Sequence, residues 1–163
     1  MTTQDRLQQA IHLRETGRAE EARALLLELV ASAPDDAQVN YQAAWVHDNL
    51  GLEREAIPFY VRAIEKGLAD ADLEGALLGL GSTYRALGEY AKAIETFKRG
   101  IKEFPHNRAF SVFLAIALYN TQQYSESVEL LLTHLAQTTV DENLVRYKRA
   151  LLFYAPQLDQ TWE

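Results

Sequence analysis

Histidine is the residue type in this sequence best suited to metal binding or proton transfer, and it occurs at four scattered positions. These are His12, His47, His106 and His134, and no two of them have the close spacing of paired metal ligands. The chain contains no cysteine, so neither a thiolate ligand nor a disulfide is available. The sequence therefore predicts no metal centre.

An acidic segment at residues 67–75, GLADADLEG, is weakly similar to a calcium-binding loop. Asp70, Asp72 and Glu74 precede Gly75 in the order that such a loop uses. A calcium loop also needs a glutamate at its twelfth position, where this chain has Gly81. We therefore favour a solvated helix N-terminus over a calcium site.

Glycines at 79, 81 and 88 do not form a phosphate-binding loop, because no strand precedes them. Gly75 and Gly79 lie one helical turn apart, a spacing that favours a close approach of two helices over a cofactor site. With no catalytic residues, metal or cofactor predicted, we expect a protein that is not an enzyme.

A pattern of turn, small and large apolar residues repeats along the chain with a period of 34 to 37 residues. Gly17, Gly51, Gly88 and Gln122 are spaced by 34, 37 and 34 residues, and each lies between two helical patterns. Five residues after each comes a small side chain, and four further on a large apolar one: Ala22 and Leu26, Ala56 and Tyr60, Ala93 and Phe97, Ser127 and Leu131. This period predicts an all-α fold of stacked helical hairpins, each unable to bury its apolar face alone.

The third unit, LLGLGSTYRALGEYAKAIETFKRGIKEFP, resembles the tetratricopeptide repeat (TPR). The matching positions are Gly81, Tyr84, Gly88, Tyr90, Ala93, Phe97, Gly100 and Pro105. Three weaker copies extend the resemblance over residues 3 to 140, and small bacterial proteins made only of TPRs are the nearest likeness. The resemblance implies a right-handed α-solenoid of four repeats, at about 3–36, 37–70, 74–107 and 108–140, within a single domain over 1–163.

Several local features refine this expectation. The turn glycines at 17, 51 and 88 are expected in the left-handed conformation that ends a helix. The three extra residues in the 37-residue spacing either lengthen a loop or add a turn to the next helix. Residues 141–155 are expected to form one capping helix, started by a capping box of Thr139 and Glu142, before a loose tail at 156–163. Trp162 in this tail has no predicted place.

Composition limits the classes of partner. The formal charge of −7 argues against binding of nucleic-acid phosphates, and no basic cluster offsets it. The longest nearly apolar run, Phe110 to Tyr119, is too short to span a bilayer. The start, MTTQDRLQQA, lacks a secretory pattern, which together with the absence of cysteine favours a cytoplasmic location. A basic or neutral protein partner is easier to accommodate than an acidic one.

One stripe on the first helix of each repeat should be polar if it faces only water, but here it is rich in apolar and aromatic residues. The TPR resemblance implies that this stripe lines a concave groove where protein partners bind. Its candidate residues are Tyr41, Gln42, Trp45, Asp48, Asn49, Leu78, Ser82, Arg85, Phe113, Ile116, Tyr119 and Asn120.

Exposure in the groove is favoured for Tyr41 and Trp45, whose rings are typical anchors of protein interfaces. For Phe113 and Ile116 the choice between groove and buried core stays open, since their helix is apolar nearly all round. His47 occupies a slot that holds Leu or Tyr in the other repeats, so we expect it to pack rather than bind a ligand.

TPR co-chaperones that grip the acidic tail of heat-shock proteins place Lys and Asn along this groove. The matching positions here are Leu7, Ile11, Gln42, Gly75 and Gly79, so this carboxylate clamp is predicted to be absent. The leading functional hypothesis is a scaffold or adaptor that binds a protein or peptide segment in the groove. The alternatives are a homodimer that occupies its own apolar surface and a regulatory receptor for a small peptide.

Overall fold

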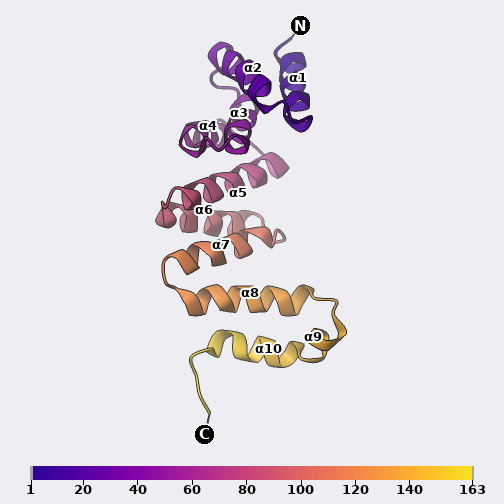
Figure 1. Cartoon of the computed structure of the whole chain (residues 1–163), viewed down its shortest axis with the longest axis vertical. Coiled ribbons are helices and arrows are strands. Elements are labelled where there is room, and N and C mark those ends of the chain that lie inside the picture. Colours follow the sequence, from indigo (N-terminus) through magenta and orange to yellow (C-terminus); the bar gives the residue numbers. More distant parts are fainter. Residues whose placement is uncertain (1, 163) are drawn as a thin grey trace. The chain divides into compact units, whose positions relative to one another are not determined.

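The computed structural model describes residues 2–162, and every element within that range is helical, which confirms the all-α prediction. The chain divides into two compact units, which we call the N-terminal unit (up to Glu89) and the C-terminal unit (from Tyr90). Each unit consists of helices that pack in sequence order (Figure 1). The prediction of a single domain over 1–163 stays a prediction.

The N-terminal unit contains α1 (Thr3–Glu15), α2 (Ala19–Ser32), α3 (Ala37–Asn49), α4 (Glu53–Glu65) and α5 (Asp70–Ala86). Two of these helices begin at side-chain caps: Thr2 and Asp5 form a capping box on α1, and the Asp36 carboxylate accepts from the Val39 amide on α3. Each helix packs on the next, because small residues allow close approach. Ala44 and Ala56, for example, are fully buried in one core cluster.

The predicted left-handed turns are confirmed. Gly17, Gly51 and Gly88 have φ angles of +81°, +72° and +77°. Gln122, which replaces the glycine in the fourth repeat, adopts the same region with φ +63°. The repeat geometry is therefore kept there at the cost of some strain in a residue with a Cβ.

The break in the repeat period lengthens a helix. α5 begins at Asp70 and runs for 17 residues, whereas α1, α3 and α7 have 12 or 13. Of the two alternatives, the three extra residues thus add a turn to the first helix of the third repeat. Asp70 and Asp72 lie in the first turn of α5, where carboxylates complement the positive end of the helix dipole.

Gly75 and Gly79 allow two tyrosine rings to reach the α5 backbone. A Cβ added at Gly75 would overlap the Tyr41 hydroxyl, and one at Gly79 would lie 2.6 Å from Cζ of Tyr60. Both tyrosines belong to the same core cluster as Ala44. The predicted close approach at these glycines is therefore confirmed, with tyrosine rings as the approaching groups.

The C-terminal unit contains α6 (Tyr90–Glu103), α7 (Ala109–Asn120), α8 (Tyr124–Thr138), α9 (Glu142–Arg146), α10 (Lys148–Tyr154) and a short 3-10 turn, η1 (Ala155–Gln157). Phe97 and Phe110 are fully buried in it. The ring of Phe110 packs where Gly100 leaves no side chain, and it stacks on Phe104 at a centroid distance of 6.3 Å.

The end of the chain differs from the prediction of one capping helix over 141–155. The helix is interrupted at Tyr147, which separates α9 from α10. The predicted capping box is also wrong, because the side chain of Asp141 caps α9 by accepting from the amides of Asn143 and Leu144. Thr139 instead accepts from the amide of Asp141, so it stabilises the turn before the helix.

The tail returns to the helices. α10 and η1 both pack on α8, and α8 and α10 run side by side in opposite directions (Figure 1). Ser125 at the start of α8 donates to the Asp159 carboxylate at 2.6 Å. Trp162 lies against Phe153 and Tyr154, at centroid distances of 6.1 and 5.5 Å, which gives this residue the place that the sequence left open. No helix within residues 2–162 is long and apolar enough to cross a membrane.

Candidate partner-binding surface

Trp45 on α3 carries a cation on its ring. The guanidinium carbon of Arg14, from α1, lies 3.8 Å from the ring centroid, a cation–π contact. The Arg14 side chain is only 9% exposed, whereas Trp45 remains 37% exposed as predicted. We call these two residues the Arg14–Trp45 platform.

Arg14 makes few polar contacts for a buried cation. Its Nε is buried without a hydrogen-bond partner in the described part of the chain. Its nearest carboxylate there is that of the adjacent Glu15, 3.5 Å from Nη2. A buried guanidinium normally requires acceptors for its N–H groups, so the unpartnered Nε–H is energetically costly.

The sequence reasoning missed Arg14, although a signal was present. Arg14, Asp48, Arg85 and Tyr119 are spaced by 34, 37 and 34 residues, the same spacings as the turn positions. Arg14 is thus the first-repeat counterpart of three predicted groove residues, Asp48, Arg85 and Tyr119. Extending the stripe to the first repeat would have included it.

Tyr41 does not line an open groove. Its side chain is only 6% exposed, so the expectation of groove exposure for this ring is wrong. The physical reason is Gly75, whose missing side chain lets the Tyr41 hydroxyl reach α5. The ring lies 5.7 Å from that of Trp45 and 6.4 Å from that of Tyr60. Tyr41 therefore packs against Trp45, and its burial raises the pKa of its hydroxyl.

Asp48 connects three helices. Its carboxylate on α3 accepts from the Tyr60 hydroxyl of α4 at 2.7 Å and from the Thr83 hydroxyl of α5 at 3.0 Å. The same Thr83 hydroxyl lies 2.9 Å from the carbonyl oxygen of Gly79. We call Asp48, Tyr60 and Thr83 the Asp48 network.

Burial sets the protonation behaviour of this network. Desolvation raises the pKa of the Asp48 carboxyl above its ordinary value, and the hydrogen bonds from Tyr60 and Thr83 only partly oppose this. The nearby charge of Glu53 acts in the same direction as burial. Burial, and then the Asp48 charge, strongly raises the pKa of the Tyr60 hydroxyl, so that group stays a hydrogen-bond donor.

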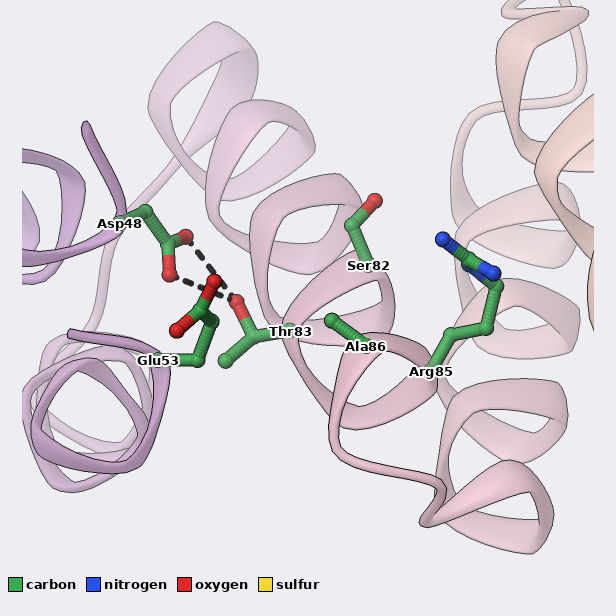
Figure 2. A pocket seen from close by; sticks show the side chains of 6 residues that line it. All are labelled: Asp48, Glu53, Ser82, Thr83, Arg85 and Ala86. Carbon is green, nitrogen blue, oxygen red and sulfur yellow. Dashed lines mark hydrogen bonds between the residues drawn. The ribbon is translucent and has the colours of Figure 1, made fainter. Parts of the chain in front are cut away.

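A hollow of about 280 Å³ lies beside this network. Its lining residues are Asp48, Glu53, Ser82, Thr83, Arg85 and Ala86. Figure 2 shows Thr83 pointing toward Asp48, while Ser82 and Arg85 extend from other sides of α5. The structure thus brings together three predicted residues, Asp48, Ser82 and Arg85, and adds Glu53 and Thr83, which the sequence reasoning missed.

The other predicted residues of the N-terminal unit differ in accessibility. Gln42 is buried, and its Oε1 has no hydrogen-bond partner within residues 2–162. Asn49 is exposed and Leu78 is half-buried. The adjacent Gln38 donates from Nε2 to the Asp72 carboxylate at 2.6 Å, a bond between α3 and α5.

The predicted residues of the C-terminal unit lie on α7. Phe113 is half-buried and packs on Phe97 at 5.9 Å, whereas Ile116 is exposed. Their place in a groove stays a prediction. Tyr119 is also exposed, and its ring contacts Tyr124 at 5.2 Å. Asn120 is half-buried, with an Oδ1 that has no hydrogen-bond partner in the described chain.

His47 packs as predicted. It is buried, with its ring 5.0 Å from that of Phe59. Arg23 donates from Nε to His47 Nε2 at 3.1 Å, which leaves Nδ1 to donate to the Ala43 carbonyl at 2.6 Å. Among residues 2–162 no group of three or more His, Asp and Glu side chains has a geometry that could hold a metal ion.

Comparison with known proteins identifies the family. The family model described as Tetratrico peptide repeat matches residues 2–40 and 37–158. The chain belongs to the tetratricopeptide repeat family. TPR proteins have no catalytic domain as part of the repeat, and their fold generally mediates protein–protein interactions. No curated protein sequence matches this TPR chain.

Several solved TPR structures share the fold. The crystal structure of MamA protein is 19% identical, with 91% of this chain and 76% of that chain covered and a TM-score of 0.75. YrrB, described as a TPR protein with an unusual peptide-binding site, is 15% identical, with coverage of 94% and 80% and a TM-score of 0.73. A Podosopora anserina putative kinesin light chain with nearly identical TPR-like repeats is 20% identical, with coverage of 96% and 86% and a TM-score of 0.69. At these identities the likeness shows the fold alone.

Proposed function

We propose that this TPR protein is a non-enzymatic, cytoplasmic scaffold or adaptor that binds a segment of a protein partner on the N-terminal unit. The main support for this proposal is the Arg14–Trp45 platform, an exposed indole that stacks with a buried guanidinium. The TPR fold supports the choice of a protein partner.

The platform suits a partner that brings a flat or apolar side chain. Trp45 offers a large, stiff surface, a property that makes tryptophan a frequent anchor of interfaces. Arg14 and Tyr41 both pack against the indole, so little side-chain entropy is lost on binding.

The net charge of the N-terminal unit restricts the charge of the segment that it can bind. Residues 1–89 hold 15 Asp and Glu against 8 Lys and Arg, so the N-terminal unit repels an acidic segment. Asp48 and Glu53 line the hollow, and no ion pair of theirs occurs within residues 2–162. We infer a neutral or basic segment, with a lysine or arginine reaching the hollow and no binding of the acidic tail of heat-shock proteins.

Peptide selection tests this function directly. A random peptide library displayed on phage is selected on the unaltered chain, and the affinities of recovered peptides are measured by calorimetry. We expect Trp45→Ala to weaken these peptides by roughly tenfold or more, since a hot-spot residue contributes about 2 kcal/mol. Leu27→Ala is the matched control, because Leu27 on α2 is also 37% exposed but lies in a second helix of a repeat.

The recovered sequences give a second readout. An excess of Lys or Arg and of aromatic residues, with binding lost in Trp45→Ala and kept in Leu27→Ala, supports the proposal. Peptides that bind Trp45→Ala as tightly as the unaltered chain would remove the platform from the binding surface. A predominance of acidic peptides would contradict the inferred charge of the partner.

A further inference from the structure

Exposed apolar side chains concentrate in the C-terminal unit. Of the fifteen large hydrophobic residues that are exposed within residues 2–162, thirteen lie from Ile116 onward. Single exposed leucines or tyrosines are normal on a protein surface, but a contiguous group of this kind marks an interface. Their concentration makes the C-terminal unit the candidate for an interface.

Two sets of side chains build this surface. Val128, Leu131 and Leu135 are about 41% exposed each and follow one another at intervals of three and four residues, so they form a stripe on one side of α8. Phe153, Tyr154 and Trp162 form an aromatic cluster at the end of α10 and in the tail. α10 packs on α8, so the stripe and the cluster belong to two neighbouring helices; we call them together the C-terminal apolar surface (Figure 1).

The exposed apolar area of this surface is high for a monomer. Its six side chains are each at least 41% exposed. If each offers roughly 70–100 Å², half of a typical side chain, the total is about 400–600 Å². This equals the largest apolar patch of a typical monomer, about 300–600 Å², and it would form the apolar centre of an interface that buries about 800 Å² on each partner.

Charge favours a second copy of this chain as the occupant. Residues 90–163 hold 8 Lys and Arg and 8 Asp and Glu, so this unit has no net charge, whereas the N-terminal unit carries the whole −7. An interface between two C-terminal units joins neutral surfaces, but one between two N-terminal units would bring together two strongly acidic ones.

The unpaired charges of α8 to α10 are also self-complementary. Glu126 and Glu129 on α8, and Arg146 and Arg149 on α9 and α10, form no ion pair within residues 2–162. In a two-fold interface each surface meets itself, so acidic residues of one copy can face basic residues of the other. We propose that the chain forms a homodimer through its C-terminal apolar surfaces.

Sedimentation velocity over a concentration series from about 1 to 200 μM tests the proposal, since a dimer responds to concentration by mass action. We expect the mass to rise from one chain to two, and Leu135→Glu to raise the dissociation constant by roughly tenfold or more. Leu27→Glu places the same charge on a comparably exposed leucine of the N-terminal unit and should leave association unchanged. Circular dichroism confirms that both variants are folded.

A second measurement uses the unaltered chain. Hydrogen exchange at low and high concentration should show slower exchange of α8 and α10 at high concentration, with α3 and α5 unchanged. A chain that stays monomeric up to 200 μM would overturn the proposal. So would equal loss of association in Leu135→Glu and Leu27→Glu, or concentration-dependent protection confined to α3 and α5, which would place the self-interface in the N-terminal unit.

Discussion

The two units use the same repeat framework but differ in what joins their helices. In the N-terminal unit, buried and half-buried side chains bond across helices: Asp48 to Tyr60 and Thr83, and Gln38 to Asp72. In the described part of the C-terminal unit, Ser127 donates to the Ala115 carbonyl and Ser125 to the Asp159 carboxylate, each at 2.6 Å. The acidic excess lies in the first unit and the exposed apolar side chains lie in the second.

This difference shows which positions of a repeat decide its surface. The small residues at Ala56, Ala93 and Ser127 are buried alike, because they set the distance between helices. The repeat position shared by Arg14, Asp48 and Tyr119 instead holds a stacked cation, a buried carboxylate and an exposed ring. The packing of helices is thus the same from repeat to repeat. The side chains at the surface position differ between repeats.

The largest expected effect comes from disturbing the contact between Gly79 and the Tyr60 ring of the Asp48 network. Gly79→Val places a branched side chain against Tyr60, whose Cζ would lie 2.6 Å from the new Cβ. We expect the free energy of unfolding of the N-terminal unit to fall by about 3 kcal/mol, since helix propensity changes little and the overlap dominates. Urea unfolding followed by circular dichroism measures this change.

The control for Gly79→Val is Ala86→Val at the exposed end of the same helix. It creates the same branched side chain without a buried contact and should change the free energy of unfolding by less than about 0.7 kcal/mol. Equal effects of the two variants would mean that the glycine is not required for the approach of Tyr60.

Removal of a tyrosine hydroxyl should reduce the free energy of unfolding by a smaller amount, which depends on whether the hydroxyl is buried or exposed. Tyr60→Phe removes the hydroxyl that donates to Asp48 at 2.7 Å and should cost about 1–2 kcal/mol, because the carboxylate loses a buried donor. Tyr119→Phe in the C-terminal unit removes an exposed hydroxyl and should cost less than about 0.5 kcal/mol. Chemical denaturation gives both values; similar losses would mean that the Asp48 network contributes nothing beyond a surface hydroxyl.

The framework of the fold could be predicted because it depends on local signals. The glycines at 17, 51 and 88 mark turns that need a left-handed residue, and the period of the small residues marks helix crossings. The end of the chain could not be predicted in the same way. No Gly or Pro signals the break at Tyr147, and Asp141 and Thr139 are both plausible caps when only the sequence is considered.

The candidate surface was predictable only in part, because it depends on contacts between repeats. Trp45 was found from its position in the stripe, but its stacking with Arg14 comes from the preceding repeat. Tyr41 shares the stripe and yet is buried, because Gly75, 34 residues later, leaves space for its hydroxyl. A stripe of residues shows which side of a helix faces the groove, but not which side chains a neighbouring helix covers.

Changes in pH should have the smallest effects on the free energy of unfolding. These effects should have opposite signs in the two units. Burial raises the pKa of Asp48, so the folded N-terminal unit binds this proton more tightly than the unfolded chain does. Its contribution to stability therefore grows as the pH falls from neutral toward the ordinary range of an aspartate. Asp48→Asn removes this titration, so the stability of the unaltered chain relative to this variant should increase on acidification.

His134 in the C-terminal unit should respond in the other direction. Burial, and then the charge of Arg108, lowers the pKa of its imidazole, and Arg108 lies 3.1 Å from its Nδ1. The folded unit thus binds a proton at His134 more weakly than the unfolded chain does. The stability that His134 contributes above the ordinary histidine pKa is therefore lost as the pH falls through the lowered pKa of the folded state. Urea unfolding between pH 7.5 and 4.5 should show the unaltered chain losing stability relative to His134→Gln while gaining it relative to Asp48→Asn. Slopes of the same sign for the two variants would contradict the contrast, because a buried carboxyl and a desolvated imidazole beside a cation must respond oppositely to acid.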